Sequence, residues 1–351
     1  MGTVATETKL IDMAMGYMRS RVVCAAARLR IADALSNGER TVEQIASACS
    51  ADPASLHRLL RVLASIGIVT EAAPGSFALT PLGEPLRRDA PHSVRPGVIF
   101  WADLLADDWS HLTECVKTGA KAAHLMERAG LPWRWSQDPD AGAIFRAVMG
   151  TAPAEQYAPI TDSWDFSPWH TVADLGGGGG SLMIAILRAF PHLKGMLVDH
   201  PASIEAAVPR FDHEGLASKC RFIAADLLEA VPAGAQVYIL KHVLHGYDDE
   251  QAVRILKNCR SAMPGDGRVL VMEFVLPNTI NRVDLDLERC LMSDLNMLAV
   301  TGGRERTEGD WTRLLERAGL QLLRGIPVPG DPTSVIEASF ATYRKTPAKQ
   351  A

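Results

Sequence analysis

The spacing of apolar residues changes near residue 168, and the two parts of the chain predict different kinds of structure. Before that point apolar residues recur mainly at helical spacing, as in KLIDMAMGYMRSRVVCAAARLRIADAL. Two more helices are expected in TVEQIASACS, where Thr41 and Gln44 form a capping-box pattern, and in DPASLHRLLRVLASIGIV, which ends near Gly67. VTEAAPGSFALT then predicts a hairpin that turns at Pro74 and Gly75.

Helices followed by a hairpin are the outline of a winged helix. His57, Arg58 and Arg61 would lie on the helix that contacts DNA in such domains, so a ligand-responsive transcription regulator is one alternative. The surrounding segment is not strongly basic, whereas attraction to phosphates supplies much of the affinity for DNA. We therefore favour a winged helix that serves packing or dimerisation.

Residues from about 86 to 165 are expected to be mostly helical and carry several large apolar side chains. Among them, Trp101, Phe145 and Met149 could together line an apolar pocket. Each of these side chains alone is more typical of a protein core. A pocket wall and ordinary core packing are therefore alternative interpretations of this segment.

After residue 168, strand and helix patterns alternate. Short apolar runs predict strands in HTVADL, LKGMLVD, CRFIAAD, AQVYILKHVLH and GRVLVMEFVLP, with helical segments such as SLMIAILRAF and DDEQAVRILKNCRSAM between them. LQLLRGIPVPG and SVIEASFATYR predict a closing hairpin. This alternation is typical of a mostly parallel sheet covered on both faces, so we expect a Rossmann-like α/β sheet with one antiparallel strand at or near its edge.

Five consecutive glycines follow the first of these strands, in DLGGGGGSLMIAILRAF. They lie between a strand and a helix, where nucleotide-binding loops occur, and ligands of such sheets bind at the carboxyl ends of the strands. Because they have no Cβ, residues such as Gly176 and Gly178 let a ligand approach the backbone. The sequence therefore predicts a nucleoside site at this loop.

Three aspartates are expected beside that loop. Asp174 precedes the glycines, Asp199 ends the next strand and Asp226 ends the third. We expect Asp199 to accept hydrogen bonds from ribose hydroxyls and Asp226 to accept one from an adenine amino group. Negative charge at Asp174 suits the sulfonium cation of S-adenosylmethionine better than it suits a pyrophosphate. A nicotinamide-dependent oxidoreductase stays open as an alternative.

A histidine in YILKHVLHGYDDE is the candidate for catalysis. His245 is expected just beyond a strand end, on the ligand side of the sheet, where a neutral imidazole could take a proton from a hydroxyl group. Because histidine and phenol have ordinary pKa values of about 6.5 and about 10, the base needs concerted methyl transfer or help from a carboxylate. Glu273 and Glu305 are expected on the same rim and could hold the ring. His242 competes for the role of base.

Composition and charge limit the class of protein. Of the 351 residues, 22% are charged and 47% hydrophobic, which is typical of a globular protein. The formal net charge of -5 gives no general attraction to nucleic acid or to an anionic membrane. Charges interrupt the apolar runs, and the first residues lack the pattern of a secretion signal. The six cysteines include no CxxC pair, so we expect reduced thiols in a cytoplasmic protein without a zinc site or disulfides.

Several segments together carry a resemblance to a known family. With DLGGGGGS, VDHP, AADLL, LKHVLHGYDDE, VMEFVLP and DLNMLAVTGGRERTEGDW, the second part of the chain resembles the class I S-adenosylmethionine-dependent O-methyltransferases of the caffeate, flavonoid and bacterial polyketide-tailoring type. GYMRSRVVCAAARLRIADAL and FALTPLGEPLRRD resemble the winged-helix dimerisation region of the same family. The resemblance covers nearly the whole chain.

The resemblance implies a domain plan, a partner and a reaction. Residues 1–100 would form a winged-helix-like dimerisation domain, 101–165 a helical linker with the acceptor-pocket region, and 166–345 the catalytic domain that binds S-adenosylmethionine. The protein would be a homodimer that methylates a hydroxyl of an aromatic or polyketide-like small molecule and releases S-adenosylhomocysteine. We expect no metal, nucleic acid or membrane to take part.

The resemblance also implies roles for individual residues. His245 would be the general base, flanked by Glu273 and Glu305. The implied cofactor contacts, to which we add Asp174 from its position, are Gly176, Gly178, Asp199, Asp226, Leu227 and Lys241. The implied acceptor pocket, to which we add Trp101, Phe145 and His242 from their positions, is lined by Met149, Asp294, Met297 and Leu298.

The sequence departs from the family pattern at two places. Many relatives carry HDW after the base, whereas this chain has Gly246 and Tyr247 there, with Asp248 and Asp249 following. The segment MGTAP around Met149 lacks the polar and histidine residues often found in plant members, so a plant-type phenylpropanoid substrate is not supported. A nitrogen or carbon acceptor stays open as an alternative to oxygen.

Overall fold

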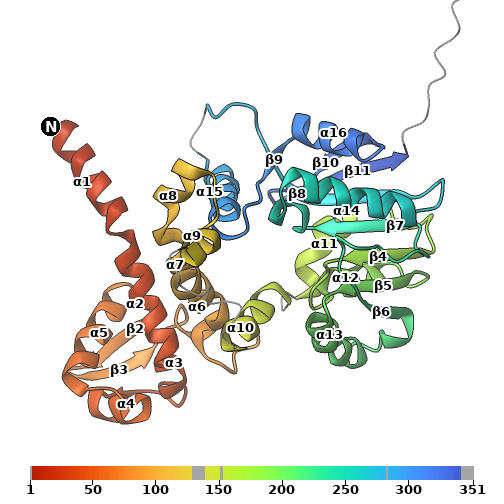
Figure 1. The fold of residues 1–351 in the computed structure, drawn as a ribbon. Coiled ribbons are helices and arrows are strands. Elements are labelled where there is room, and N and C mark those ends of the chain that lie inside the picture. The colour runs from red at the N-terminus through yellow and green to blue at the C-terminus, as the bar shows by residue number, and fades with distance from the viewer. Residues whose placement is uncertain (1, 129–138, 151–152, 282–283, 341–351) are drawn as a thin grey trace, which may run out of the picture. The chain divides into compact units, whose positions relative to one another are not determined.

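The computed structural model describes residues 2–128, 139–150, 153–281 and 284–340 (Figure 1). The chain divides into two compact units. Met1–Ser110 and Arg134–Val148 make up the first unit, and His111–Trp133 and Met149–Ala351 the second. Each unit has a hydrophobic core of its own, so each is described by itself.

The first unit combines helices with a small antiparallel sheet. Its strands follow the order β1-β3-β2 and are β1 (Arg40–Thr41), β2 (Val69–Ala73) and β3 (Ser76–Leu79). Its helices are α1 (Gly2–Ala14), α2 (Gly16–Arg28), α3 (Ile31–Ala34), α4 (Val42–Cys49), α5 (Pro53–Ser65), α6 (Arg95–Ile99), α7 (Leu105–Ser110) and α10 (Pro139–Gly150), which ends in the second unit. A π-helical segment, Phe100–Leu104, joins α6 to α7.

Local sequence signals account for the start of two of these helices. The Thr41 hydroxyl accepts a hydrogen bond from the Gln44 amide, and the Gln44 side chain accepts one from the Thr41 amide, which confirms the predicted capping box at α4. Asp52 caps α5 by a single hydrogen bond, which its side chain accepts from the amide of Ser55. The predicted hairpin is also confirmed, since β2 and β3 pair antiparallel across Pro74 and Gly75. The helices and hairpin therefore form the expected winged-helix outline.

The second unit is built on a large, mostly parallel sheet. Its strands follow the order β10-β11-β8-β7-β4-β5-β6, and β9 pairs with β8 outside this order. β11 is antiparallel to both of its neighbours, β8 and β10, and lies one strand from the edge. The strands are β4 (Thr171–Leu175), β5 (Lys194–Asp199), β6 (Cys220–Ala224), β7 (Val237–Lys241), β8 (Arg268–Leu276), β9 (Arg306–Thr307), β10 (Leu320–Pro327) and β11 (Thr333–Phe340). This confirms the expected Rossmann-like sheet with one antiparallel strand.

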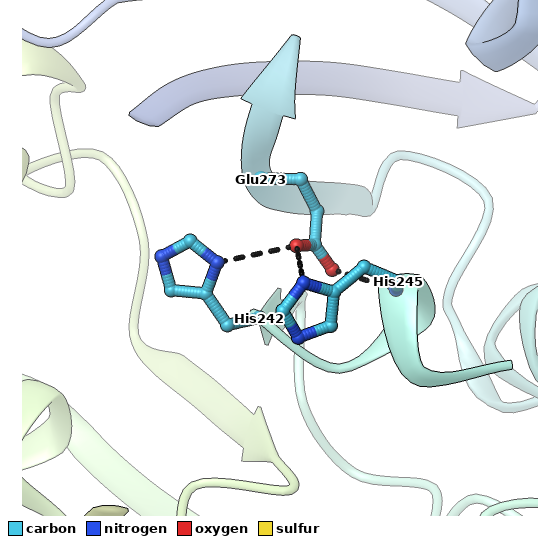
Figure 2. A group of neighbouring side chains, drawn as sticks. All are labelled: His242, His245 and Glu273. Atoms are coloured by element: carbon cyan, nitrogen blue, oxygen red, sulfur yellow. Dashed lines mark hydrogen bonds and ion pairs between the residues drawn. The ribbon is translucent and has the colours of Figure 1, made fainter. Parts of the chain in front are cut away.

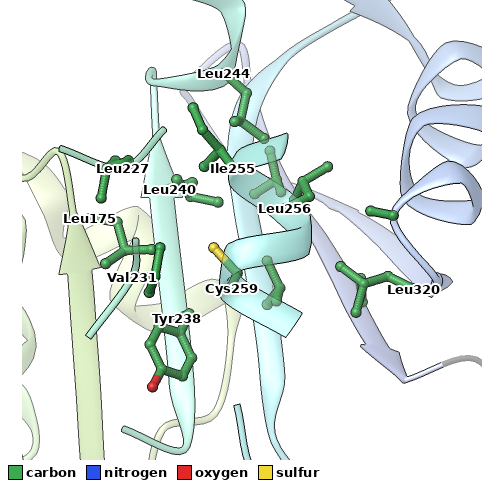
Figure 3. Packing of buried hydrophobic residues seen from close by; sticks show 14 of the residues in the cluster. Leu175, Leu227, Val231, Tyr238, Leu240, Leu244, Ile255, Leu256, Cys259 and Leu320 are labelled. Atoms are coloured by element: carbon green, nitrogen blue, oxygen red, sulfur yellow. The ribbon is translucent and has the colours of Figure 1, made fainter. Parts of the chain in front are cut away.

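Helices cover both faces of that sheet and bury an alternating set of strand residues. In β7, Tyr238 and Leu240 belong to the core beneath α14 (Asp249–Ala262) and α16 (Glu308–Arg317) (Figure 3). Val237 and Ile239 belong to the core beneath α12 (Ser181–Ala189) and α13 (Pro201–His213). Both sets of strand side chains are buried, as expected for central strands covered on both faces. The helices of this unit are α8 (Leu112–Thr118), α9 (Ala122–Arg128), α11 (Ala158–Ser163), α12 (Ser181–Ala189), α13 (Pro201–His213), α14 (Asp249–Ala262), α15 (Leu285–Val300) and α16 (Glu308–Arg317).

Two general expectations from composition can be compared with the structure. All six cysteines lie in described segments, and each is a free thiol. Within the described ranges, every helix is too short or too polar to cross a membrane.

Candidate active site

The glycine run forms the turn between β4 and α12, and the backbone itself requires several of its glycines. Gly176, Gly178 and Gly180 have φ values of 70°, 56° and 75°, a region that side chains with a Cβ rarely adopt. At Gly177 a Cβ would lie 2.5 Å from Oδ2 of Asp174. Close approach of a ligand, which the sequence suggested, is therefore not the only reason for this composition.

The predicted acids lie at the ends of the three neighbouring strands β4, β5 and β6. Asp199 is half-buried at the end of β5, and its Oδ2 accepts a hydrogen bond from the Gly178 amide at 2.8 Å. Asp226 is exposed just beyond β6 and accepts a hydrogen bond from the Leu228 amide at 2.9 Å, while the neighbouring Leu227 is buried. These contacts hold both carboxylates at the rim that carries the glycine turn.

Asp174 is the acid with the most unusual surroundings. Its side chain is buried, and Oδ2 has no hydrogen-bond partner among the described residues. Burial, and then the negative charge of Asp199, raise the pKa of Asp174 to about 7. This carboxyl group can therefore change its charge near neutral pH.

Lys241 ends β7 on the same rim. Its Nζ lies 5.3 Å from the centre of the Tyr157 ring, a cation–π contact. Burial lowers the pKa of Lys241, and the charges of Asp331, Glu273 and Asp174 oppose that effect. Tyr157 was not predicted from sequence, because a single tyrosine in a helical segment carries no signal of a partner so far along the chain.

His245 lies on a 3₁₀ turn, Leu244–Gly246, that follows β7. Its Nδ1 lies 2.8 Å from Oε1 of Glu305 and 3.6 Å from Oε2 of Glu273. Burial by itself lowers the pKa of this histidine, but the charges of both glutamates and the hydrogen bond to Glu305 outweigh it, so the pKa of His245 is raised above 6.5. The carboxylates place the proton of the neutral ring on Nδ1, which leaves the lone pair on Nε2.

Glu273 holds the backbone of the same turn. It is fully buried within β8, which continues to Leu276. Its Oε1 accepts hydrogen bonds from the amides of Val243, Leu244 and His245 at 3.0, 2.9 and 3.3 Å. Burial by itself raises the pKa of Glu273. The charges of the two histidines and the hydrogen bonds to Glu273 lower the pKa by more than burial raises it, so the group stays ionised.

Glu305 is buried immediately before β9, and two residues of α15 hold it. Its Oε1 also accepts a hydrogen bond from the Ser293 hydroxyl at 2.7 Å, and its amide donates to Oδ1 of Asp294 at 2.8 Å. Asp294 was predicted to line the acceptor pocket, and one of its oxygens is thus engaged with the backbone. Ser293 was missed, although its position beside Asp294 on a helix near the GGRERTE segment was an available signal.

His242 belongs to the same cluster, and both of its ring nitrogens have partners. Nδ1 lies 3.3 Å from Oε2 of Glu273 (Figure 2), and Nε2 lies 3.4 Å from the Thr333 hydroxyl. Burial lowers the pKa of His242, and its φ of 51° is unusual for a residue with a Cβ. This ring is therefore placed to hold Glu273 in position.

Three atoms of this cluster are close enough to one another to hold a metal ion. One ligand atom from each of His242, His245 and Glu273 lies within 4.8 Å of the other two, and the Nδ1 atoms of the two histidines lie 3.3 and 3.6 Å from Oε2 of Glu273 (Figure 2). A metal needs a lone pair on each ligand nitrogen. Here each Nδ1 faces a carboxylate oxygen and is placed to donate a hydrogen bond to it. The hydrogen-bonded network therefore needs a proton on each Nδ1, whereas a metal site would need a lone pair on the same atoms.

The other predicted acceptor-pocket residues lie in both units. Met297 and Leu298 are half-buried on α15 of the second unit. Trp101 and Phe145 belong to the first unit, where their side chains are 57% and 40% exposed and both rings contact Phe100. The side chain of Met149, on α10, lies outside the described part of the structure.

Comparison with known proteins identifies the family. The model of the O-methyltransferase domain matches residues 109–321, and that of the O-methyltransferase dimerisation domain matches residues 11–88. The chain is 34% identical over 337 residues to phenazine O-methyltransferase PhzM of Lysobacter antibioticus, covering 96% of this chain and 97% of that protein. It is also 34% identical over 324 residues to 8-amino-8-demethylriboflavin N,N-dimethyltransferase of Streptomyces davaonensis, covering 90% of each chain.

Solved structures agree with these relatives. The crystal structure of LaPhzM has a TM-score of 0.88 and 33% identity, covering 96% of this chain and 99% of that one. An O-methyltransferase from neocarzinostatin biosynthesis, solved with S-adenosylmethionine and 2-hydroxy-5-methyl naphthoic acid, has a TM-score of 0.77 and 31% identity, covering 92% and 96%. The chain therefore belongs to the O-methyltransferase family, with a dimerisation domain before the catalytic one, and is an S-adenosylmethionine-dependent methyltransferase.

Proposed function

We propose that the protein methylates a hydroxyl group of an aromatic or polyketide-like small molecule and that His245 is the general base. One observation carries this proposal: Nδ1 of His245 faces two buried carboxylates, so Nε2 is left with its lone pair. A ring held in this way can accept a proton at Nε2, and the carboxylates of Glu273 and Glu305 stabilise the imidazolium that forms. Both glutamates therefore act on the base and not on the acceptor.

The cofactor site is proposed at the rim formed by the ends of β4, β5, β6 and β7. Asp174 offers a buried oxygen without a partner among the described residues, which suits a cationic ligand. The neighbouring turn is free of Cβ atoms, which suits close contact with a ligand. The proposed contacts are Asp174, Gly176, Gly178, Asp199, Asp226, Leu227 and Lys241.

When bound, S-adenosylmethionine supplies a methyl group that its sulfonium has already activated. The work left to the protein is then mainly to orient the acceptor and to remove its proton. The raised pKa of His245 brings it closer to that of a phenol, about 10, and reduces the free energy needed to move the proton. The fixed position of the turn holds Nε2 at one place while this happens.

The acceptor is proposed to be aromatic because the relatives act on such molecules. One relative is named for a phenazine, and one solved structure contains a naphthoic acid. The residues proposed to line the acceptor pocket are Trp101, Phe145, Met149, His242, Asp294, Met297 and Leu298. Apart from Asp294 and His242, these side chains are aromatic or aliphatic, which does not require a charged acceptor.

A homodimer is proposed through the N-terminal helices, with residues 1–100 as the dimerisation domain. Large apolar side chains on α1 and the start of α2 are exposed in a single chain: Leu10, Ile11, Met13 and Tyr17 are 62%, 60%, 69% and 62% exposed. Exposed apolar side chains gathered in this way mark interaction surfaces. The match to a dimerisation-domain model over residues 11–88 supports a second copy of this chain as the partner.

A nitrogen acceptor is the second candidate, because one relative is named as an N,N-dimethyltransferase. A neutral amine attacks through its own lone pair and needs no base before the methyl group is transferred. The two candidates therefore differ in their dependence on His245.

A screen with isotopically labelled methyl donor would test the proposal. Phenolic, polyketide and aromatic-amine acceptors are incubated with the enzyme, and methylated products are detected by mass shift. We expect phenolic products and a His245→Ala variant that turns over about 10²–10⁴-fold more slowly, with unchanged affinity for S-adenosylhomocysteine. Products methylated only on nitrogen, or full activity of the variant, would refute the proposed chemistry.

A further inference from the structure

Arg306 is a buried cation whose every N–H group has an acceptor. The residue is 0% exposed. Nε and Nη2 donate to Oδ1 of Asp249 at 3.0 and 2.8 Å, and Nη2 also donates to the Tyr247 carbonyl at 3.0 Å. Nη1 donates to the carbonyls of Leu244 and Arg304 at 2.9 and 3.3 Å. These bonds use all the donors of a guanidinium group.

The acceptors of Arg306 surround the turn that carries His245. The Leu244 carbonyl precedes His245, the Tyr247 carbonyl follows it, and Asp249 is the first residue of α14. The guanidinium carbon also lies 5.2 Å from the centre of the Trp311 ring on α16, a cation–π contact. A single side chain thus ties the turn to the helix that follows it.

Glu273 and the GGRERTE segment hold the remaining backbone groups of this turn. Oε1 of Glu273 accepts the amide hydrogens of Val243, Leu244 and His245. The His245 carbonyl accepts a hydrogen bond from the Arg304 amide at 2.9 Å. A carboxylate therefore binds the N–H groups and a guanidinium binds C=O groups of the same few residues.

We propose that Arg306 is a positioning residue for the base. It is the first residue of β9 and follows Glu305 directly, so two consecutive residues supply the carboxylate that orients the imidazole and the cation that holds the backbone of the turn. Loss of the guanidinium would let the turn shift while Glu305 stays in place. The His245 ring would then no longer be aligned with the Glu305 carboxylate. This inference rests on the proposed role of His245.

Two substitutions test the role of Arg306. Arg306→Met keeps much of the length and removes the charge and all donors. Arg306→Lys keeps the charge, but one ammonium group cannot reach Leu244, Tyr247 and Asp249 together. We expect kcat to fall about 10²-fold in Arg306→Met and less in Arg306→Lys, because a displacement of the base by about 1 Å has an effect of that size. The affinity for S-adenosylhomocysteine, measured by calorimetry, should not change.

Arg268→Met is the matched control for lost packing and lost charge. Arg268 pairs with Glu337 at 3.1 Å, donates to the carbonyls of Asp266 and Gly267, and lies over the Trp169 ring. It therefore makes the same kinds of contact at the start of β8, away from the His245 turn. We expect Arg268→Met to lower the melting temperature without a fall in kcat measured well below that temperature.

A double-mutant cycle with His245→Ala separates positioning from a general structural role. If Arg306 acts through His245, either Arg306 substitution should have almost no further effect on kcat once the imidazole is gone. An equal fall in kcat in both backgrounds would overturn the inference, and so would unchanged kcat in both single variants. Full activity of His245→Ala alone would instead refute the proposed base, so the two failures are distinguishable.

Discussion

Nδ1 of His245 lies 2.8 Å from Oε1 of Glu305, a residue 60 positions further along the chain. A hydrogen bond to a carboxylate is short and strong because the acceptor is charged. It fixes the orientation of the ring and stabilises the imidazolium relative to the neutral imidazole. The contact therefore affects both how often the base is in its neutral form and how readily it accepts a proton.

The first prediction concerns the pH dependence of turnover. Only the neutral ring is a base, and the pKa of His245 is raised above 6.5, so kcat should rise with pH through a value above 6.5. Glu305→Gln removes one of the charges that raise this pKa, so the acid limb of the profile should move to lower pH and the maximal rate should fall. Rate–pH profiles of the unsubstituted enzyme and of Glu305→Gln measure the position of the acid limb and the maximal rate. Glu288→Gln, on the exposed side of α15, is the control, and an acid limb that does not move in Glu305→Gln would contradict the prediction.

The second prediction concerns the stability of the turn. Glu273→Ala leaves the amides of Val243, Leu244 and His245 without their acceptor, and a buried unsatisfied donor costs about 1–3 kcal/mol. We expect the free energy of unfolding to fall by about 3–5 kcal/mol, the range for removing one partner from a buried ionic network. Glu273→Gln keeps a carbonyl oxygen and should lose less. Urea denaturation of both variants gives the comparison, and equal losses would show that the amide contacts are not the cause.

The parts of the site that sequence could predict are those that depend on strand ends. Asp174, Asp199, His245 and the glycine turn follow strands with clear apolar patterns, and parallel strands bring their carboxyl ends to one edge. The parts that it missed are contacts between distant segments. Three such contacts depend on how α15, β11 and a short helical turn pack. They are the hydrogen bond from Ser293 to Glu305, the hydrogen bond between Thr333 and His242, and the contact of Lys241 with Tyr157.

Very short strands and an unusual backbone angle could not be predicted from the sequence either. β1 and β9 have two residues each, too few for a period to be recognised. The positive φ of His242 is held by tertiary contacts and has no local signal. Arg306 lies in GGRERTE, a segment that carries the family resemblance. The carbonyls of Leu244 and Tyr247, which accept its hydrogen bonds, lie on a different loop.

The third prediction concerns binding of the cofactor as a function of pH. Asp174 has a pKa raised to about 7, so it is mostly protonated below that pH and mostly ionised above it. A cationic ligand prefers the ionised form, so affinity for S-adenosylmethionine should rise with pH through about 7, and binding near neutral pH should release protons. Calorimetry in buffers of different ionisation enthalpy detects that release. It should disappear in Asp174→Asn, and proton release that persists in this variant would assign it to another group.

The fourth prediction concerns the glycine turn. A Cβ at Gly177 would lie 2.5 Å from Oδ2 of Asp174 and 2.6 Å from Cδ1 of Leu197. Overpacking of this kind typically costs about 1–3 kcal/mol, so Gly177→Ala should lower both the melting temperature and the affinity for S-adenosylhomocysteine. Gly325→Ala is the matched control, since no atom lies within 4 Å of its Cβ position. If both variants behave alike, the crowding at Gly177 is not what requires glycine there.

The fifth prediction concerns metal ions. Zinc would need lone pairs on Nδ1 of His242 and of His245, but both nitrogens face carboxylate oxygens, at 3.3 Å from Glu273 and 2.8 Å from Glu305. We therefore expect exhaustive chelation to leave kcat unchanged and added zinc to inhibit, because zinc would displace the protons that orient both rings. Turnover after dialysis against a chelator, with metal content determined by mass spectrometry, measures this. Activity that is lost on chelation and restored by zinc would show that the cluster is a metal centre and that His245 does not act as a free base.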